Sequence, residues 1–404
     1  MTTMADIGAT GPTPSPAGPA DVSHDRRGSW IPTAGMIATR FMELRKRRGL
    51  MVALILVTIG IPTVFLVIRL LLHAFAPHSY GPAGGYDVFT GLVAGVLYVF
   101  GFIVAATLGA TAGSIDLTEG MFRHLVVTGR SRLAIYVARI PAGLAVIVPL
   151  VAVGFTIVCA VCVFAAPTRL SFNGVNVPLN LSRAGFEGWA ADHPDEVICN
   201  FGFSIGPSVP NSSTIGPAVN SVPCGNSPGG GPTIVKQSPG SQVQPQASQA
   251  QIREAARVIA GVNYSGYTTK FLYPSDSLMV RSGLWLELEA CIGFVVGLGL
   301  GSLIGQRTVA VIMMIVLEVI LTPILSRARL PHLANLQRAV VGLATAHLAP
   351  GGLPVLGGGG GGPGGGAGNP RLLPESTTVA VCVIIAWLVG WTILGAWRMM
   401  TRDA

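Results

Sequence analysis

The chain has 404 residues, of which 50% are hydrophobic and 11% are charged, and its mean hydropathy is +0.60. Soluble domains carry about 25% charged residues, so this composition excludes an ordinary soluble enzyme. The net charge is +8, but the basic residues lie beside apolar segments instead of forming patches interleaved with aromatic residues. The sequence therefore predicts an all-α polytopic membrane protein and no nucleic-acid partner.

The chain begins with a leader, residues 1–28, that is rich in Ala, Gly, Pro, Ser and Thr. It cannot bury enough apolar surface to offset chain entropy, so we expect it to be disordered. Residues 33–48 then place Ile37, Phe41 and Leu44 on one helical face. This pattern predicts an interfacial amphipathic helix on the membrane lipids; a basic linker is the alternative.

Six apolar segments are each close to the roughly 20 residues that a helix needs to cross a bilayer. Pro62 lies inside the first segment, where we expect a kink, and Pro141 fits the first turn of the third. Two membrane regions result, residues 50–164 and 284–404. The six predicted spans are 50–72, 88–112, 142–164, 284–305, 308–325 and 378–397.

The short loops indicate the orientation. Lys and Arg gather before the first span, between spans two and three, and after span six, whereas residues 73–87 contain neither. Basic loops stay in the cytoplasm, so we expect both termini there. Four arginines in the last outer loop count against this orientation but are outnumbered. The expected location is the plasma membrane, with multiple passes.

Residues 165–283 are long enough to form a small extracytoplasmic domain. Residues 204–248 have a flexible composition, whereas residues 249–262 have a helical pattern. Cys199 and Cys224 are the cysteines outside the spans, and we expect a disulfide between them on the oxidising side; two free thiols are the alternative. Residues 357–368 form a glycine-rich outer linker before span six.

Charged residues are scarce within the spans. Glu318 is either a polar contact in a translocation path or across a helix interface, or a residue near the outer end of its span that reaches water or a partner hydroxyl. Glu287 and Glu289 are predicted at the start of span four, where the helix dipole favours acids.

Small residues recur every four positions in spans two and four. Such a register lets another helix approach closely, and it predicts either a tight bundle or a dimer seam. The glycines concerned are Gly101, Gly109, Gly113, Gly293, Gly297, Gly301 and Gly305.

The cytoplasmic connection between spans two and three, residues 114–140, has the pattern of a short amphipathic helix. Ser114 is predicted to cap it, and Asp116 and Glu119 lie near its positive end. A helix of this kind suits docking into a groove of a cytosolic partner; a helix on lipid headgroups is the alternative.

This connection resembles that of type 2 ABC exporter permeases, in which a Glu, a Gly-Thr-x-Arg run and a Pro-x-Ser-Arg-like turn lie between the second and third of six spans. The similar residues here are Glu119-Gly120-Met121-Phe122-Arg123, then Gly129-Arg130-Ser131-Arg132. Met121 stands where Thr is usual and Gly129 where Pro is usual. A later turn, residues 305–308, and residues 318–325 are also similar. The resemblance covers residues 33–164 and 284–404.

The resemblance implies a permease subunit that pairs as a dimer and exports a drug, lipid or glycan, driven by separate cytosolic ATPase subunits. No Lys precedes Ser or Thr, so the phosphate-binding loop is absent and no enzyme activity or cofactor is expected on this chain. ATP and Mg²⁺ would bind the partner. An ATPase-independent sensor or anchor with a ligand-binding outer loop is the alternative. The expected coupling residues are Asp116, Glu119, Gly120, Arg123, Arg130 and Arg132.

Overall fold

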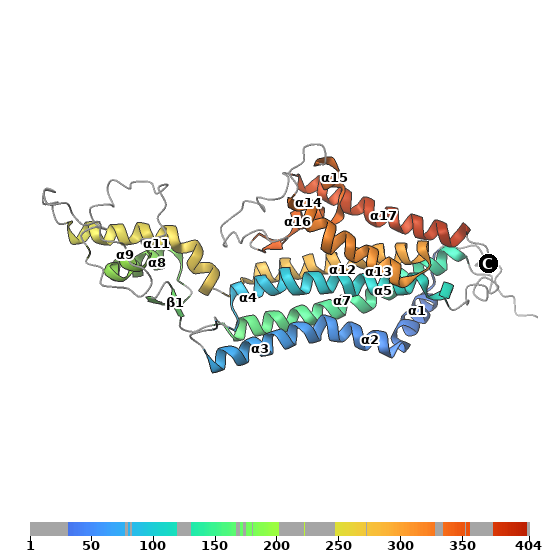
Figure 1. Ribbon diagram of the computed structural model, residues 1–404, viewed down its shortest axis with the longest axis horizontal. Coiled ribbons are helices and arrows are strands. Elements are labelled where there is room, and N and C mark those ends of the chain that lie inside the picture. Colours follow the sequence, from blue (N-terminus) through green and yellow to red (C-terminus); the bar gives the residue numbers. More distant parts are fainter. Residues whose placement is uncertain are drawn as a thin grey trace, which may run out of the picture.

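In the part of the chain that the structure describes, six helices are long and apolar enough to cross a membrane, and they pack side by side in one bundle (Figure 1). The predicted all-α polytopic membrane fold is confirmed. The leader and the glycine-rich linker lie outside the described residues. This computed structural model describes residues 31–76, 80, 83–118, 131–166, 170–172, 175–179, 181–201, 222, 247–271, 273–327, 334–351, 353–355 and 375–401.

The observed spans cover the six predicted segments except for Gly305, which follows span four, and three of the spans contain a π-helical turn. Span one consists of α2 (Arg48–Ile55), the π turn η2 (Leu56–Gly60) and α3 (Ile61–Phe75). Span two consists of α4 (Tyr86–Gly91), the π turn η3 (Leu92–Leu97) and α5 (Tyr98–Thr118). Spans three and four are α7 (Arg132–Phe164) and α12 (Asp276–Ile304). Span five consists of α13 (Arg307–Ile315), the π turn η5 (Val316–Leu321) and α14 (Thr322–Arg327), and span six is α17 (Thr377–Thr401).

Two predictions at the junction of spans two and three are wrong, because both helices extend beyond their apolar cores. Ser114 does not cap a new helix: it is buried within α5, and its hydroxyl donates to the Ala110 carbonyl at 2.8 Å. Helix α7 begins at Arg132, where Ser131 accepts a capping hydrogen bond from the Ala134 amide. Pro141 therefore lies inside α7 rather than in its first turn.

Spans two and four form the centre of the bundle. Most of their residues are buried within the protein, whereas spans one, five and six are mostly exposed. The exposed side chains of these outer spans are largely aliphatic, as expected for helices that face hydrocarbon. Helix α5 runs along α12, and this pair positions the polar groups described below.

The segment predicted as an interfacial helix is helical and forms α1 (Ala34–Lys46). It lies against α7, with Leu44 buried and Phe41 packed on the core of the bundle. Its apolar face is therefore covered in part by protein. In Figure 1, α1 and the last turns of α17 lie at the same end of the bundle, which we call the terminal end.

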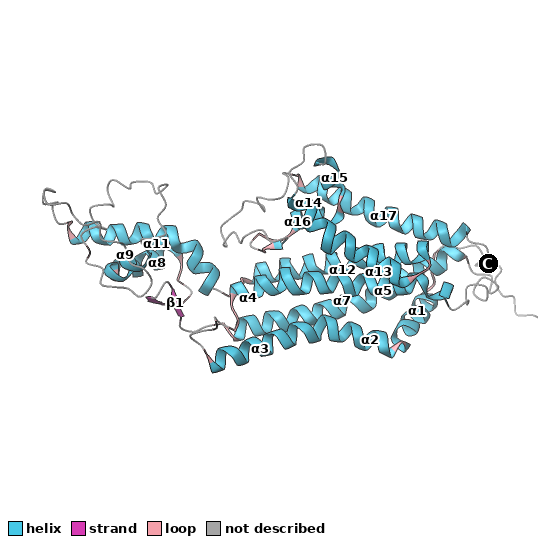
Figure 2. Cartoon of the chain, in the orientation of Figure 1, coloured by secondary structure: helices cyan, strands magenta, loops and turns pink. Residues whose placement is uncertain are grey.

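A small domain inserted between spans three and four lies at the opposite end (Figure 1). It contains a two-stranded antiparallel hairpin, which the sequence patterns do not predict and which Figure 2 shows beside the helices. The predicted helix at 249–262 is present and continues to residue 271. The elements of this inserted domain are β1 (Leu170–Phe172), β2 (Val175–Val177), α8 (Arg183–Asp192), α9 (Pro194–Phe201) and α11 (Gln249–Phe271).

Aromatic side chains hold the inserted domain together. Phe186 of α8 is fully buried and stacks on Tyr267 of α11, with ring centroids 4.4 Å apart. The Tyr267 hydroxyl donates to the Pro178 carbonyl at 2.6 Å and accepts from the Leu181 amide at 3.1 Å. Burial raises the pKa of this phenol, so it stays protonated and keeps donating at neutral pH. The domain thus has its own core, separate from that of the bundle.

Cys199 of α9 is disulfide-bonded, whereas Cys159, Cys162, Cys291 and Cys382 are free thiols. Cys224, the remaining cysteine of the six, lies outside the described residues.

A bridge between Cys199 and Cys224 is expected to stabilise the inserted domain by roughly 3–4 kcal/mol, because closing 26 residues (199 to 224 inclusive) lowers the entropy of the unfolded chain. Peptide mapping without reductant should recover the two cysteines in one linked fragment. Free alkylation of both thiols in intact cells would exclude the bridge and weaken the predicted outward placement of this domain.

Two short helices between spans five and six pack back against the bundle. They are α15 (Ala334–Ala339) and α16 (Val341–Leu348). Gln337 donates to the Leu325 carbonyl at 2.5 Å, and the indole of Trp387 in α17 donates to the Ala339 carbonyl at 2.8 Å. Most of α16 is buried, which brings its backbone beside polar side chains of spans four and five.

Candidate functional site

Helices α5 and α12 approach each other most closely at glycines. A Cβ added to Gly297 would lie 2.5 Å from the Ala106 carbonyl oxygen, and one added to Gly301 would lie 2.5 Å from that of Ala110. Only hydrogen fits at these positions, so the glycine registers of the two spans pack against each other within one chain. The glycines at this contact are Gly109, Gly113, Gly293, Gly297 and Gly301.

The other two glycines of the register do not contribute to this contact. An added Cβ on Gly101 would meet nothing within 4 Å. Gly305 follows α12 with a φ of 77°, and its amide donates to the Gly301 carbonyl at 2.9 Å. Its role is to end the helix in the left-handed conformation that glycine adopts without strain.

A cavity of about 280 Å³ lies between spans two and five. Its wall is mainly apolar, and its polar side chains are those of Tyr98 and Glu318. Such a combination, an apolar pocket with a few oriented polar groups, is typical of small-molecule sites. The lining residues are Gly91, Ala94, Gly95, Tyr98, Val99, Phe102, Glu318, Val319, Pro323 and Pro354.

Both sides of the cavity are built from π-helical turns. The turn η3 supplies Ala94 and Gly95, and η5 supplies Glu318 and Val319. Pro323 lacks an amide hydrogen, which disturbs the regular bonding of the preceding turn. The Thr322 hydroxyl donates to the Leu317 carbonyl at 2.9 Å within the same turn. Such turns are frequent at functional sites because they redirect side chains.

Glu318 lies near the middle of span five and is 4% exposed, so it does not reach water at the end of its span. The Tyr98 hydroxyl donates to one of its carboxylate oxygens, and the Thr322 hydroxyl lies 3.4 Å from the other. The carboxylate also lies against Gly342 of α16, where any side chain would collide with it. Contacts with span two, with α16 and within its own span therefore fix the position of Glu318.

The prediction that Glu289 lies at the start of span four is wrong. Because α12 begins at Asp276, Glu289 instead lies well inside the helix and is 2% exposed. It is close enough to Glu318 to interact electrostatically, and its Oε1 has no hydrogen-bond partner in the described part of the chain. The bundle thus contains two neighbouring buried carboxyl groups.

Trp285 completes this polar cluster. Its indole stacks on Tyr98 with centroids 5.2 Å apart and donates to the Thr345 carbonyl of α16 at 3.0 Å. Trp285 and Glu289 are one helical turn apart on α12, so they occupy the same face. No sequence signal connects these residues, because they come from four distant segments.

No family model, no curated protein and no solved structure matches this chain. Its site is therefore interpreted from its own geometry. Among the described residues, no group of three or more His, Cys, Asp or Glu side chains is arranged to hold a metal ion.

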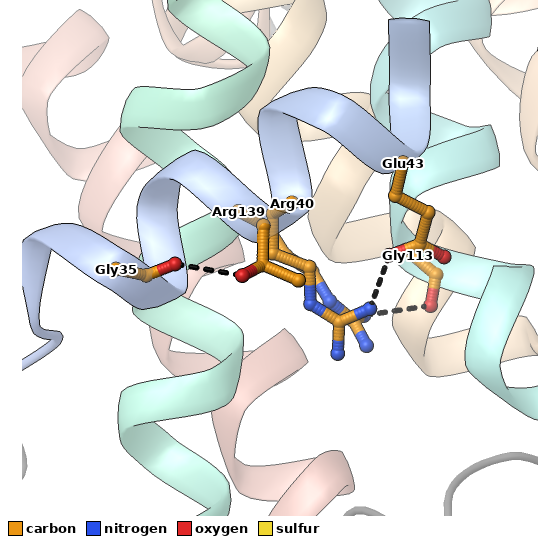
Figure 3. Close-up of polar contacts among 6 residues, drawn as sticks. Gly35, Arg40, Glu43, Gly113 and Arg139 are labelled. Carbon is orange, nitrogen blue, oxygen red and sulfur yellow. Dashed lines mark hydrogen bonds and ion pairs between the residues drawn. The ribbon is translucent and has the colours of Figure 1, made fainter. Parts of the chain in front are cut away.

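A second polar cluster lies at the terminal end. Figure 3 shows Arg40 and Glu43 of α1 beside Arg139 of α7 and Gly113 of α5. Arg40 and Glu43 form an ion pair of 2.7 Å, and the buried Arg139 donates to the Gly113 carbonyl at 3.2 Å. Gly113 also accepts from Ser302 of α12 at 3.4 Å. These contacts join the ends of α5, α7 and α12, with α1 packed beside them.

The expected coupling residues lie in or beside the connection that leaves this end. Arg132 begins α7, and its guanidinium donates to the Met400 carbonyl at the end of α17, 3.1 Å away. Asp116 lies in the last turn of α5, but its side chain is outside the described part. The remaining expected coupling residues, all outside the described residues, are Glu119, Gly120, Arg123 and Arg130.

Proposed function

We propose that the chain is the membrane subunit of an ATP-driven type 2 ABC exporter. The observation that carries this proposal is the continuity of span two between the cavity and the connection. Tyr98 and Phe102 line the cavity, and the same helix α5 continues to Thr118, where the connection begins. About 30 Å of uninterrupted helix thus connects the cavity wall at Tyr98 to the start of the connection at Thr118.

A continuous helix suits the transmission of force. A partner that pushed on residues 119–131 would move α5 and α7 together, because Arg139 ties α7 to the end of α5. The bond from Arg132 to Met400 extends this tie to α17. Such a movement would reach the cavity wall at Tyr98, as an exporter driven from one side of the membrane requires.

In this proposal the terminal end is cytoplasmic, the inserted domain is extracytoplasmic, and the protein resides in the plasma membrane. The loop arginines support this orientation. ATPase subunits dock at the terminal end and bind ATP and Mg²⁺. A second copy pairs with the largely exposed apolar faces of spans one, five and six, which also meet lipid.

Co-expression followed by affinity purification tests the proposal. An ATP-binding protein encoded near this chain should co-purify in detergent and hydrolyse ATP when both are reconstituted. Failure of every neighbouring ATPase to bind, together with no transport defect on their deletion, would favour a sensor or anchor that acts through the inserted domain.

Charge reversal in the connection should uncouple ATP hydrolysis from transport. Glu119→Lys or Arg123→Glu would break a charge pair with the ATPase, and loss of one partner of a buried pair costs about 2–5 kcal/mol. We expect at least a tenfold loss of transport per ATP hydrolysed, measured in proteoliposomes. The matched control is Arg45→Glu, which makes the same charge change as Arg123→Glu on an exposed position of α1. Equal coupling in all three variants would contradict the docking assignment.

A further inference from the structure

We infer that the cavity between spans two and five binds a small hydrophobic ammonium ion, with Glu318 as its counter-charge. Binding itself follows from the cavity alone; that the ion is the transported substrate rests on the proposed function. Three features of the cavity favour this ligand, namely its charge, its aromatic wall and its size.

The cavity is lined by an acidic side chain, Glu318. Among the described lining residues, Glu318 is the one carboxyl group, and none is Lys, Arg or His. Glu289 adds a second carboxyl group behind it, with a buried oxygen that has no hydrogen-bond partner among described residues. Buried acids without a cation are unfavourable, so a cation in the cavity would supply the missing partner. An anionic ligand would be repelled.

The aromatic wall favours an alkylated ammonium over a metal ion. Tyr98 and Phe102 are four residues apart, so their rings lie on one face of span two, and both line the cavity. Aromatic faces attract organic cations, and quaternary ammonium groups are commonly recognised in this way. The remaining lining residues are apolar or glycine and suit a hydrocarbon substituent.

The size of the cavity limits the ligand. A volume of about 280 Å³ equals roughly nine waters at their liquid volume, which corresponds to a ligand of about ten non-hydrogen atoms. Benzyltrimethylammonium fits this limit and combines a permanent charge with an aromatic group. Neopentylbenzene has the same shape without the charge, so the pair separates the electrostatic contribution from the apolar one.

The test is equilibrium dialysis of radiolabelled benzyltrimethylammonium against the full-length purified protein in detergent, with neopentylbenzene as competitor. Wild-type protein should bind the cation saturably and at least tenfold more tightly than the neutral compound. Glu318→Gln should weaken cation binding at least tenfold and leave the neutral compound unchanged. Glu287→Gln is the matched control, because Glu287 lies on α12 and does not line the cavity.

Equal cation affinity of wild type and Glu318→Gln, or equal affinity of the two compounds for wild type, would overturn the inference. If Glu318→Gln does not fold, Phe102→Leu tests the same inference. This substitution should weaken binding of the cation several-fold and leave binding of neopentylbenzene unchanged. Unchanged cation binding in that variant would also overturn it. Dialysis needs no ATPase, so the two proposals can fail separately. Saturable cation binding, combined with failure to find any ATPase partner in the co-purification test, would refute only the proposed function. An active ATPase complex whose membrane subunit does not bind the cation would refute only this inference.

Discussion

Gly297→Val is expected to destabilise the bundle by about 3 kcal/mol, the upper end of the range for overpacked cores. The reason is that even a Cβ at this position would lie 2.5 Å from the Ala106 carbonyl oxygen and close to the Ala106 Cα. The obstacle is backbone, which cannot rotate away as a side chain would. Helices α5 and α12 would have to separate, and the cavity wall of span two would move with α5.

The measurement is the thermal unfolding midpoint of the purified protein in detergent, followed by size-exclusion chromatography after heating. Gly101→Val is the matched control. Gly101 lies on α5, as Ala106 does, and a Cβ added to it would meet nothing within 4 Å. We expect the control to unfold near the wild-type temperature. Equal destabilisation by both substitutions would mean that valine perturbs these helices generally and that the close contact has no special role.

Phe186→Ala should destabilise the inserted domain by about 3–5 kcal/mol, the range for removing a buried aromatic side chain. Phe186 is fully buried and is the ring shared by four aromatic contacts, with Trp189, Phe201, Tyr264 and Tyr267. Its loss leaves a cavity between α8, α9 and α11. Since this core is separate from that of the bundle, the spans should remain folded.

Limited proteolysis reports on the inserted domain, and the thermal midpoint reports on the spans. We expect rapid cleavage within residues 170–271 and an unchanged midpoint for the bundle. Phe164→Ala is the control, because Phe164 ends α7 and is 89% exposed. Simultaneous unfolding of domain and bundle would show that the two cores are energetically coupled.

The spans could be predicted from the sequence because their signal is local. A run of about 20 apolar residues has one stable arrangement in a bilayer, whatever its neighbours are. The helix ends could not be placed equally well, since α5, α7 and α12 continue past the apolar window into polar residues. Pro141, Ser114 and Glu289 were misplaced for this reason.

The candidate site was only partly predictable. Glu318 was recognisable by itself, because a carboxyl group within an apolar segment is rare. Its neighbours were not, since Tyr98 is 220 residues away along the chain and Glu289 lies in another span. The short hairpin was missed as well, since β1 and β2 have three residues each, too few for a clear alternating pattern.

By itself the sequence determined that this protein crosses a membrane six times, that its inserted domain lies between spans three and four, and that spans two and four have glycine faces. These properties depend on composition and on periodicity within single segments. Only the tertiary structure decided that the two glycine faces meet within one chain, and that Tyr98, Glu289 and Glu318 gather beside one cavity. The physical reason is that helix packing is set by close contacts between distant segments, and the spacing of residues within a segment does not specify its partner.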